Sequence, residues 1–113
     1  MTEKKPDIDL EWEFLIGKLT KVIGKKPNMD AILFLIGTQE LGRGPQRFSK
    51  EEKQDLMHVG ICRLLSQSGY YELEGLDQDG WPHYKLLKPL PKFDLLEQEK
   101  FLQMHIKEYF ADL

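Results

Sequence analysis

Apolar and polar residues follow two different periods along this chain, and the longer period predicts the helices. From residue 10 to residue 23, apolar side chains recur every three or four positions, as they do on one face of a helix. This face contains Trp12, Leu15, Ile16, Leu19, Val22 and Ile23. Asp9 is a residue type that caps helix N-termini, and Gly24 followed by Pro27 ends the pattern. We therefore expect a first helix over residues 9–23.

The next segment is apolar on every side. Residues 31–36 are Ala-Ile-Leu-Phe-Leu-Ile, and Asn28 is a suitable helix cap before them. A helix without a polar stripe is buried on most of its sides, so a helix over residues 29–41 would be the central element of the fold. A buried strand is the alternative interpretation of so short a run. The cap and the continuation of the segment to Leu41 favour the helix.

A third helix is predicted after the glycine- and proline-containing loop of residues 42–48. Ser49 and Glu52 have the spacing of a capping box, which marks its start. Its main apolar face is expected to contain Met57, Ile61, Leu64, Leu65 and Ser68. Leu56 and Val59 fall off this face, on a second side of the helix with Gly60.

The period then changes from about four residues to two, which is typical of strands. Tyr71, Leu73 and Gly75 alternate with Tyr70, Glu72, Glu74 and Leu76. Residues 77–80 are a turn signal, and residues 81–87 are predicted to form the return strand. A hairpin alone is marginally stable in water, so we expect its aromatic face to lie on the helices.

A last helix is predicted from Asp94 and Glu97 to about Phe110, with its apolar stripe on Leu95, Leu102, Ile106 and Tyr109. The predicted class is α+β and mostly α: a three-helix core, then a β-hairpin and a C-terminal helix. We expect residues 1–8 to form a flexible arm and residues 9–113 a single globular domain. The order of elements resembles a winged-helix module with an added helix, and the resemblance is one of topology alone.

The winged-helix resemblance implies a nucleic-acid-binding function, with the third helix in the major groove and the hairpin as a wing. The charges oppose this function. The chain has 113 residues and a net charge of −3. Residues 1–48 carry a net charge of +1 and residues 49–113, which contain the third helix and the hairpin, carry −4. Asp77 and Asp79 at the expected wing tip would repel phosphates, whereas nucleic-acid-binding domains usually present a basic surface.

The loop before the third helix contains the residues of a candidate anion site. Arg43 and Arg47 flank a Gly-Pro turn that leads to Ser49 at the helix N-terminus. Free backbone N–H groups and the helix dipole favour an anion there, and an arginine can bind phosphate or carboxylate with two hydrogen bonds. Glu51 and Glu52 oppose the hypothesis because they already complement the dipole.

Metal binding and catalysis have weaker support. His58 and Cys62 have the four-residue helical spacing of two metal ligands, but a structural zinc site needs four ligands. Cys62 is more readily explained as a small buried apolar residue in the middle of a helix than as a nucleophile. No Ser-His-acid pattern and no glycine-rich phosphate loop is present in the sequence. We expect no metal, no cofactor and no enzymatic activity.

Apolar residues outside the predicted stripes indicate an interaction surface. These residues are Leu56, Val59, Phe101 and Met104. Aromatic and methionine side chains are enriched where proteins meet. Our main hypothesis is therefore a protein–protein interaction or self-association domain without catalysis, with a homodimer as one form of it. Nucleic-acid binding is the alternative.

The same sequence gives an expectation for location. The longest apolar run is far shorter than the roughly 20 residues of a membrane span, and no apolar stretch of the signal-peptide kind follows the N-terminus. The single cysteine excludes an internal disulfide. We therefore expect a cytoplasmic protein that does not bind membranes.

Overall fold

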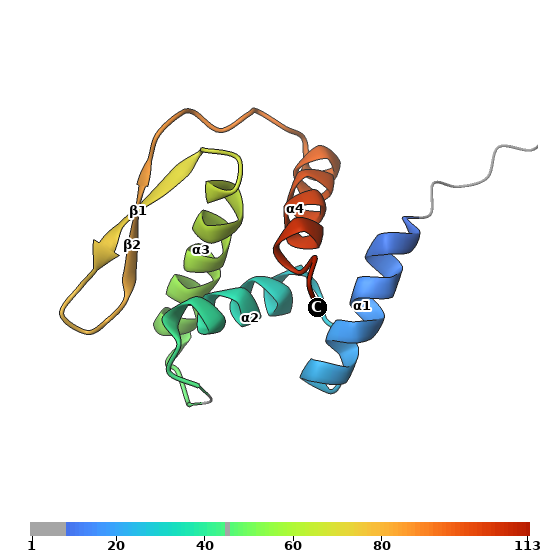
Figure 1. Cartoon of the computed structure of the whole chain (residues 1–113), viewed down its shortest axis with the longest axis horizontal. Helices are drawn as coiled ribbons and strands as arrows, with labels where there is room; N and C mark the ends of the chain where they lie inside the picture. The colour runs from blue at the N-terminus through green and yellow to red at the C-terminus, as the bar shows by residue number, and fades with distance from the viewer. Residues whose placement is uncertain (1–8, 45) are drawn as a thin grey trace, which may run out of the picture.

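The fold has the element order that the sequence predicts. The computed structural model describes residues 9–44 and 46–113, so the predicted N-terminal arm lies outside the described residues. The elements are α1 (Leu10–Ile23), α2 (Met29–Leu41), α3 (Lys50–Ser66), β1 (Tyr71–Leu76), β2 (Pro82–Leu86) and α4 (Leu95–Tyr109) (Figure 1). The predicted class, α+β and mostly α with a C-terminal helix after the hairpin, is confirmed.

Each helix begins where a polar side chain satisfies a backbone N–H that has no partner within the helix. Asp9 accepts a hydrogen bond from the N–H of the third residue after it, and Asn28 does the same at the start of α2. Ser49 and Asp94 form complete capping boxes, in which the side chain of a glutamate three residues further along accepts a hydrogen bond from the N–H of the cap residue. These local bonds explain why the helix starts could be predicted from the sequence.

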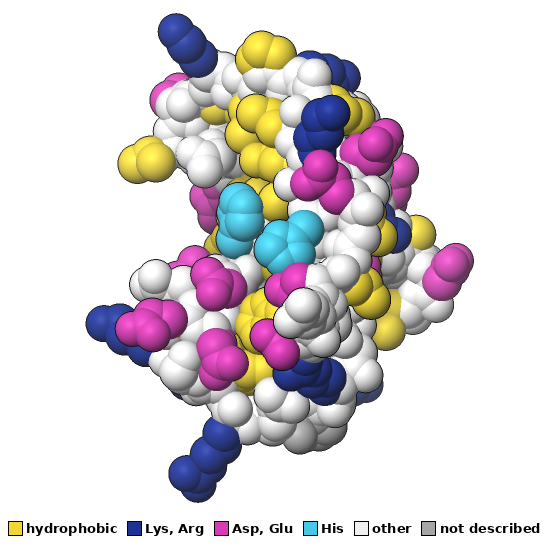
Figure 2. Space-filling view, turned by 90° about the vertical axis from the view of Figure 1, so that its left-hand side faces the viewer, with side chains coloured by type: hydrophobic (Ala, Val, Ile, Leu, Met, Phe, Trp, Pro, Cys, Tyr) yellow, Lys and Arg dark blue, Asp and Glu magenta, His cyan; other side chains and the backbone are white. Residues whose placement is uncertain are grey.

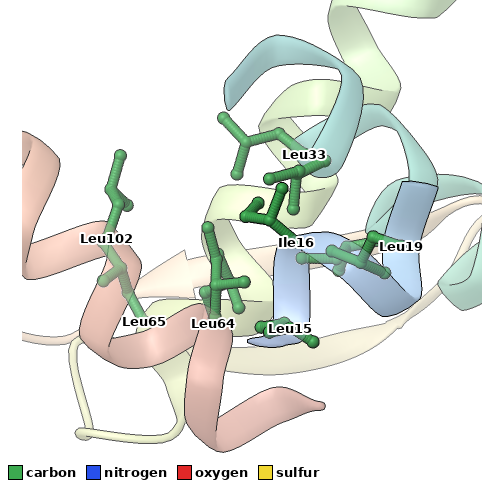
Figure 3. Packing of buried hydrophobic residues seen from close by; sticks show 10 residues of the cluster. Leu15, Ile16, Leu19, Leu33, Leu64, Leu65 and Leu102 are labelled. Atoms are coloured by element: carbon green, nitrogen blue, oxygen red, sulfur yellow. The ribbon is translucent and has the colours of Figure 1, made fainter. Parts of the chain in front are cut away.

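One cluster of buried apolar side chains draws on all four helices. α1 contributes Leu15, Ile16 and Leu19, and the other helices contribute Ile32, Leu33, Ile36, Leu64, Leu65, Leu102 and Ile106 (Figure 3). The predicted face of α1 is confirmed at its centre, but Val22 lies outside the core and is exposed. In the part of the chain that is described, no helix is long and apolar enough to span a membrane.

Two glycines bring α2 and α3 into close contact. A β-carbon at Gly37 would overlap the backbone carbonyl of Leu56, and one at Gly60 would overlap the backbone carbonyl of Leu33. The two helices therefore meet backbone to backbone, with one glycine supplied by each. This packing buries the side of α3 that carries Leu56, Val59 and Gly60.

The prediction that Leu56 and Val59 belong to an interaction surface is therefore wrong. Leu56 is 0% exposed and Val59 is also buried, both within the chain itself. The physical reason is that α3 buries two sides, one against α2 and one against the rest of the core. Met57 and Ile61 of the predicted main face are only partly buried, although Leu64 and Leu65 are in the core as predicted.

The hairpin contains a β-bulge that the sequence pattern did not indicate. Leu73 lies opposite Tyr84, but the next pair is Gly75 with His83, so β1 has one extra residue between these pairs. Gly75 has φ 148°, a conformation that disfavours residues with a β-carbon. Leu76 lies opposite Pro82, two residues from Tyr84, so the bulge places Leu76 on the same face of the hairpin as Leu73. Strict alternation predicted Leu76 on the opposite face, and this prediction is wrong.

The hairpin packs on the helices through aromatic residues, in agreement with the prediction. Phe48 of the α2–α3 loop makes edge-to-face contacts with Phe34 of α2 and with Trp81 beside β2, at ring-centroid distances of 6.0 and 6.5 Å. Pro82 is buried and Tyr84 is partly buried. These contacts fix the turn of the hairpin beside the N-terminal half of α3.

α4 buries most of its predicted stripe but not the first residue of it. Leu102 is 8% exposed and Ile106 is buried, whereas Leu95 is 85% exposed. The prediction that Leu95 belongs to the packed stripe is wrong because no described element covers the first turn of α4. His105 is also buried on this helix, between the carbonyl of Phe101 and the hydroxyl of Ser68.

Candidate functional site

A cavity lies between α3 and the hairpin, and we call it the α3–hairpin groove. It has a volume of about 510 Å³. Its lining residues come from α3 (Glu52, Asp55, His58, Val59 and Cys62) and from the hairpin (Asp77, Asp79, Trp81, Pro82, His83 and Tyr84). Figure 2 shows this side of the molecule, where two histidines lie side by side and carboxylates surround apolar side chains below them. The groove thus has an apolar floor and an acidic rim.

Asp77 holds the hairpin turn in the shape that closes one wall of the groove. Its Oδ1 accepts hydrogen bonds from the backbone N–H groups of Asp79 and Trp81, at 2.9 and 3.0 Å. Its Oδ2 accepts a hydrogen bond of 2.9 Å from Nε2 of His83. The bond from His83, followed by the bond from the Trp81 N–H, lowers the pKa of the Asp77 carboxyl. Asp77 therefore remains ionised in this wall at neutral pH.

The cysteine of the groove has the properties of a packed side chain. Cys62 Sγ lies 3.4 Å from Nε2 of His58, one helical turn earlier on α3. Burial raises the pKa of the Cys62 thiol to about 11, so a thiolate is rare at neutral pH. Within the described residues, no group of three or more His, Cys, Asp or Glu side chains is arranged to hold a metal ion.

The charge of the groove is unfavourable for nucleic acid. Four carboxylates line it, from Glu52, Asp55, Asp77 and Asp79, whereas its lining includes no lysine or arginine. In a winged-helix arrangement, this face of the third helix and the neighbouring wing would approach the phosphates. Carboxylates there would repel the phosphates. They also could not replace the counter-ions whose release drives binding to nucleic acid.

The three residues of the predicted anion site have different surroundings. Ser49 is occupied by its capping box: its Oγ accepts from the N–H of Glu52, and its own N–H donates to Glu52 Oε1. Arg43 is exposed and its guanidinium lies near Gly80 in the hairpin turn. Arg47 is also exposed and lines a different groove with Lys53. An anion site here remains a prediction that depends on the two arginines without the help of Ser49.

A second surface surrounds the first turn of α4, and we call it the α4 shoulder. It consists of Leu90, Phe93, Leu95 and Leu96, all of which are exposed. Leu95 and Leu96 are the most exposed of the four, and Leu96 is 61% exposed. Beside them lies an apolar cavity of about 390 Å³ between α3, α4 and the β2–α4 connection, lined in part by Leu90, Phe93 and Phe101. The shoulder combines protruding apolar side chains with an apolar depression.

The two residues of α4 that were predicted to belong to an interaction surface, Phe101 and Met104, differ in their exposure. Met104 is exposed. Phe101 is partly buried and contacts the rings of Tyr70, Phe93 and His105 at centroid distances of 5.9, 5.1 and 4.5 Å. Sequence reasoning missed the α4 shoulder because it assigned Leu95 to the packed stripe. The signal for it was the concentration of leucine and phenylalanine over residues 90–96, in the segment that begins with Pro89 and contains Pro91.

Comparisons with protein-family models, with curated proteins and with solved structures gave no significant match to this chain. The geometry and chemistry of the two surfaces are therefore the basis for a functional proposal.

Proposed function

We propose that this chain is a small protein-interaction domain without catalytic activity, and that it self-associates through the α4 shoulder. The main observation in support of this proposal is the exposure of Leu95. Leu95 precedes the buried residues Leu102 and Ile106 by seven and eleven positions, so all three lie on one side of α4. The packed face of the helix therefore continues past the edge of the core, and its first leucine has no partner among the described residues.

The amount of exposed apolar surface agrees with a concentration-dependent dimer. Burial of a whole leucine or phenylalanine side chain contributes roughly 1.5–3 kcal/mol. The shoulder offers four such side chains, each partly exposed, and a two-fold interface uses the same patch on both copies. The resulting gain is similar in size to the cost of association, about 4–15 kcal/mol. We therefore expect reversible dimers and not an obligate assembly.

The absence of catalysis in this proposal is supported by the chemistry of the α3–hairpin groove. Its only thiol is buried, with a raised pKa, and the Asp77–His83 pair holds the turn in place. The alternative function, nucleic-acid binding, has support from the order of elements. The four carboxylates of the groove oppose it.

The test is a measurement of molar mass by light scattering after size exclusion, from about 1 μM to about 1 mM protein. We expect the mass to rise from 13.3 kDa towards twice that value as the concentration increases. Leu95→Gln should prevent the rise. Leu10→Gln is the matched control because Leu10 is also the first residue of a helix and is 74% exposed.

Two results would overturn the proposal. One is a monomer at every concentration. The other is an equal effect of Leu95→Gln and Leu10→Gln, because the interface would then not be specific to the shoulder. Titration with duplex DNA at low salt tests the alternative function, since non-specific binding of nucleic acid is strongest under those conditions.

A further inference from the structure

We propose that the α3–hairpin groove binds a lysine- or arginine-bearing segment of a partner protein. This inference is independent of self-association, because the groove and the α4 shoulder are built from different residues. The negative charge of the rim and the apolar floor of the groove both point to such a segment.

The rim of the groove presents negative charge from both walls. Asp55 lies on α3 and Asp79 lies in the hairpin turn, and both are exposed. Neither forms an ion pair within the described residues, whereas Asp77 is bonded to His83. A positively charged side chain between the walls would meet carboxylates on two sides. Charge complementarity of this kind selects the partner and accelerates its association.

The floor of the groove suits the stem of a long cationic side chain. Val59 and Pro82 are buried, and Trp81 and Tyr84 are partly buried, so their apolar atoms form the base between the carboxylates. Lysine and arginine lay their aliphatic stems on apolar surface and keep the charged group at its polar edge. A cation is also attracted to the face of an indole ring. The combined floor and rim therefore match both parts of such a side chain.

The chain itself places a guanidinium beside the hairpin turn. A terminal nitrogen of Arg43 lies 3.6 Å from the position that a β-carbon would occupy at Gly80, in the hairpin turn next to Asp79. The acidic turn thus has an arginine of the chain beside it, although no ion pair within 4.0 Å is formed there among the described residues.

The experiment is a titration of the full chain that carries Trp12→Phe, which leaves Trp81 as the only tryptophan. The probe is a short peptide in which lysine alternates with alanine and serine, and the readout is the fluorescence of Trp81. The control peptide has glutamine in place of every lysine. We expect saturable binding of the lysine peptide that weakens as salt is added, and no binding of the control peptide.

The decisive comparison uses two double variants with the same change in net charge. Asp55→Asn with Asp79→Asn removes one carboxylate from each wall, and we expect the affinity to fall roughly tenfold. Glu99→Gln with Glu108→Gln removes two exposed carboxylates from α4, and the affinity should remain unchanged. Circular dichroism confirms that each variant is folded. Leu95→Gln should bind the peptide like the parent, which separates this inference from the proposed dimer.

Four outcomes would overturn the inference: no binding of the lysine peptide at low salt, an equal loss of affinity in both double variants, tighter binding of duplex DNA than of the peptide, or an equal affinity for free spermidine. The second would show a response to net charge alone. The third would assign the surface to nucleic acid, and the fourth to a small cation in place of a protein segment.

Discussion

Gly37 of α2 and Leu56 of α3 are in contact through their backbones, with no room for a side chain on the glycine. The reciprocal contact between Gly60 of α3 and Leu33 of α2 completes the crossing. Both glycines lie inside helices, where glycine is less favourable than alanine by about 1 kcal/mol. The close approach of the two helices explains why glycine occupies these positions.

We predict that Gly37→Ala or Gly60→Ala lowers the free energy of unfolding by about 3 kcal/mol or more. The new β-carbon would meet a backbone carbonyl, which cannot rotate away as a flexible side chain would. Urea denaturation followed by circular dichroism measures the change. Gly17→Ala in α1 is the control, because nothing lies within 4 Å of its β-carbon position. That substitution should raise the stability by about 0.5–1 kcal/mol. A neutral effect of Gly37→Ala would contradict the backbone contact.

The buried ring of His105 supports a second prediction. The carbonyl of Phe101 can only accept a hydrogen bond, so Nδ1 of His105 carries the hydrogen of their 2.8 Å bond. In the neutral ring, Nε2 then accepts from the hydroxyl of Ser68 at 2.7 Å. Ser68→Ala leaves Nε2 without this donor and should lower the stability by about 1 kcal/mol. Ser68→Thr retains the hydroxyl and should lose less. Equal losses in the two variants would show that the hydrogen bond is not the cause.

The Asp77–His83 pair predicts a loss of stability in acid. The pKa of Asp77 is lower in the folded chain than in the unfolded chain, so the unfolded state binds a proton more readily. The contribution of Asp77 is therefore complete above its unfolded pKa, near 4, and is lost as the pH falls through its folded pKa.

Asp77→Asn separates this titration from the shape of the turn. The asparagine oxygen can still accept from the N–H groups of Asp79 and Trp81, but the side chain does not ionise. The variant should be somewhat less stable than the wild type at pH 7 and should lose less stability on acidification. The readout is urea denaturation at a series of pH values between about 2 and 7. Parallel curves for the two proteins would exclude a contribution from Asp77.

Cys62 should react slowly with thiol reagents while the chain is folded. A pKa of about 11 in place of the ordinary 9.0 makes the thiolate about a hundredfold rarer at pH 8, and burial also restricts access. Labelling with a disulfide reagent should therefore be at least about a hundredfold faster in concentrated urea. His58→Ala should leave the folded rate low because burial causes the shift. Rapid labelling of the folded wild type would instead indicate an activated thiol.

The local elements were predictable because their signals are local. Ser49 and Asp94 start their helices with bonds to residues three positions away, and such spacing is visible in the sequence. The centre of the core face of α1 follows from periodicity in the same way, whereas the burial of α2 follows from a run that is apolar on every side. The resulting order of elements was correct without knowledge of any contact between them.

Helix faces and surfaces were harder to predict because they depend on contacts that are distant in sequence. The side of α3 with Leu56 and Val59 is buried because Gly37 and Gly60 allow α2 to approach it, and a glycine adds no apolar signal to a periodic pattern. Leu95 continues the periodicity of the buried residues of α4, but no described element packs on it. The acidic residues of the α3–hairpin groove come from two segments that only the folded chain brings together.

The extra residue of β1 has no partner of its own on β2. If Glu74 were deleted, Leu73, Gly75 and Leu76 could each keep the partner that they have on β2, and the ladder would become regular. A single-codon deletion there would remove the local kink and leave every cross-strand pair in place. The bulge is thus a position at which the hairpin can lose a residue without a shift in the pairing of its tip.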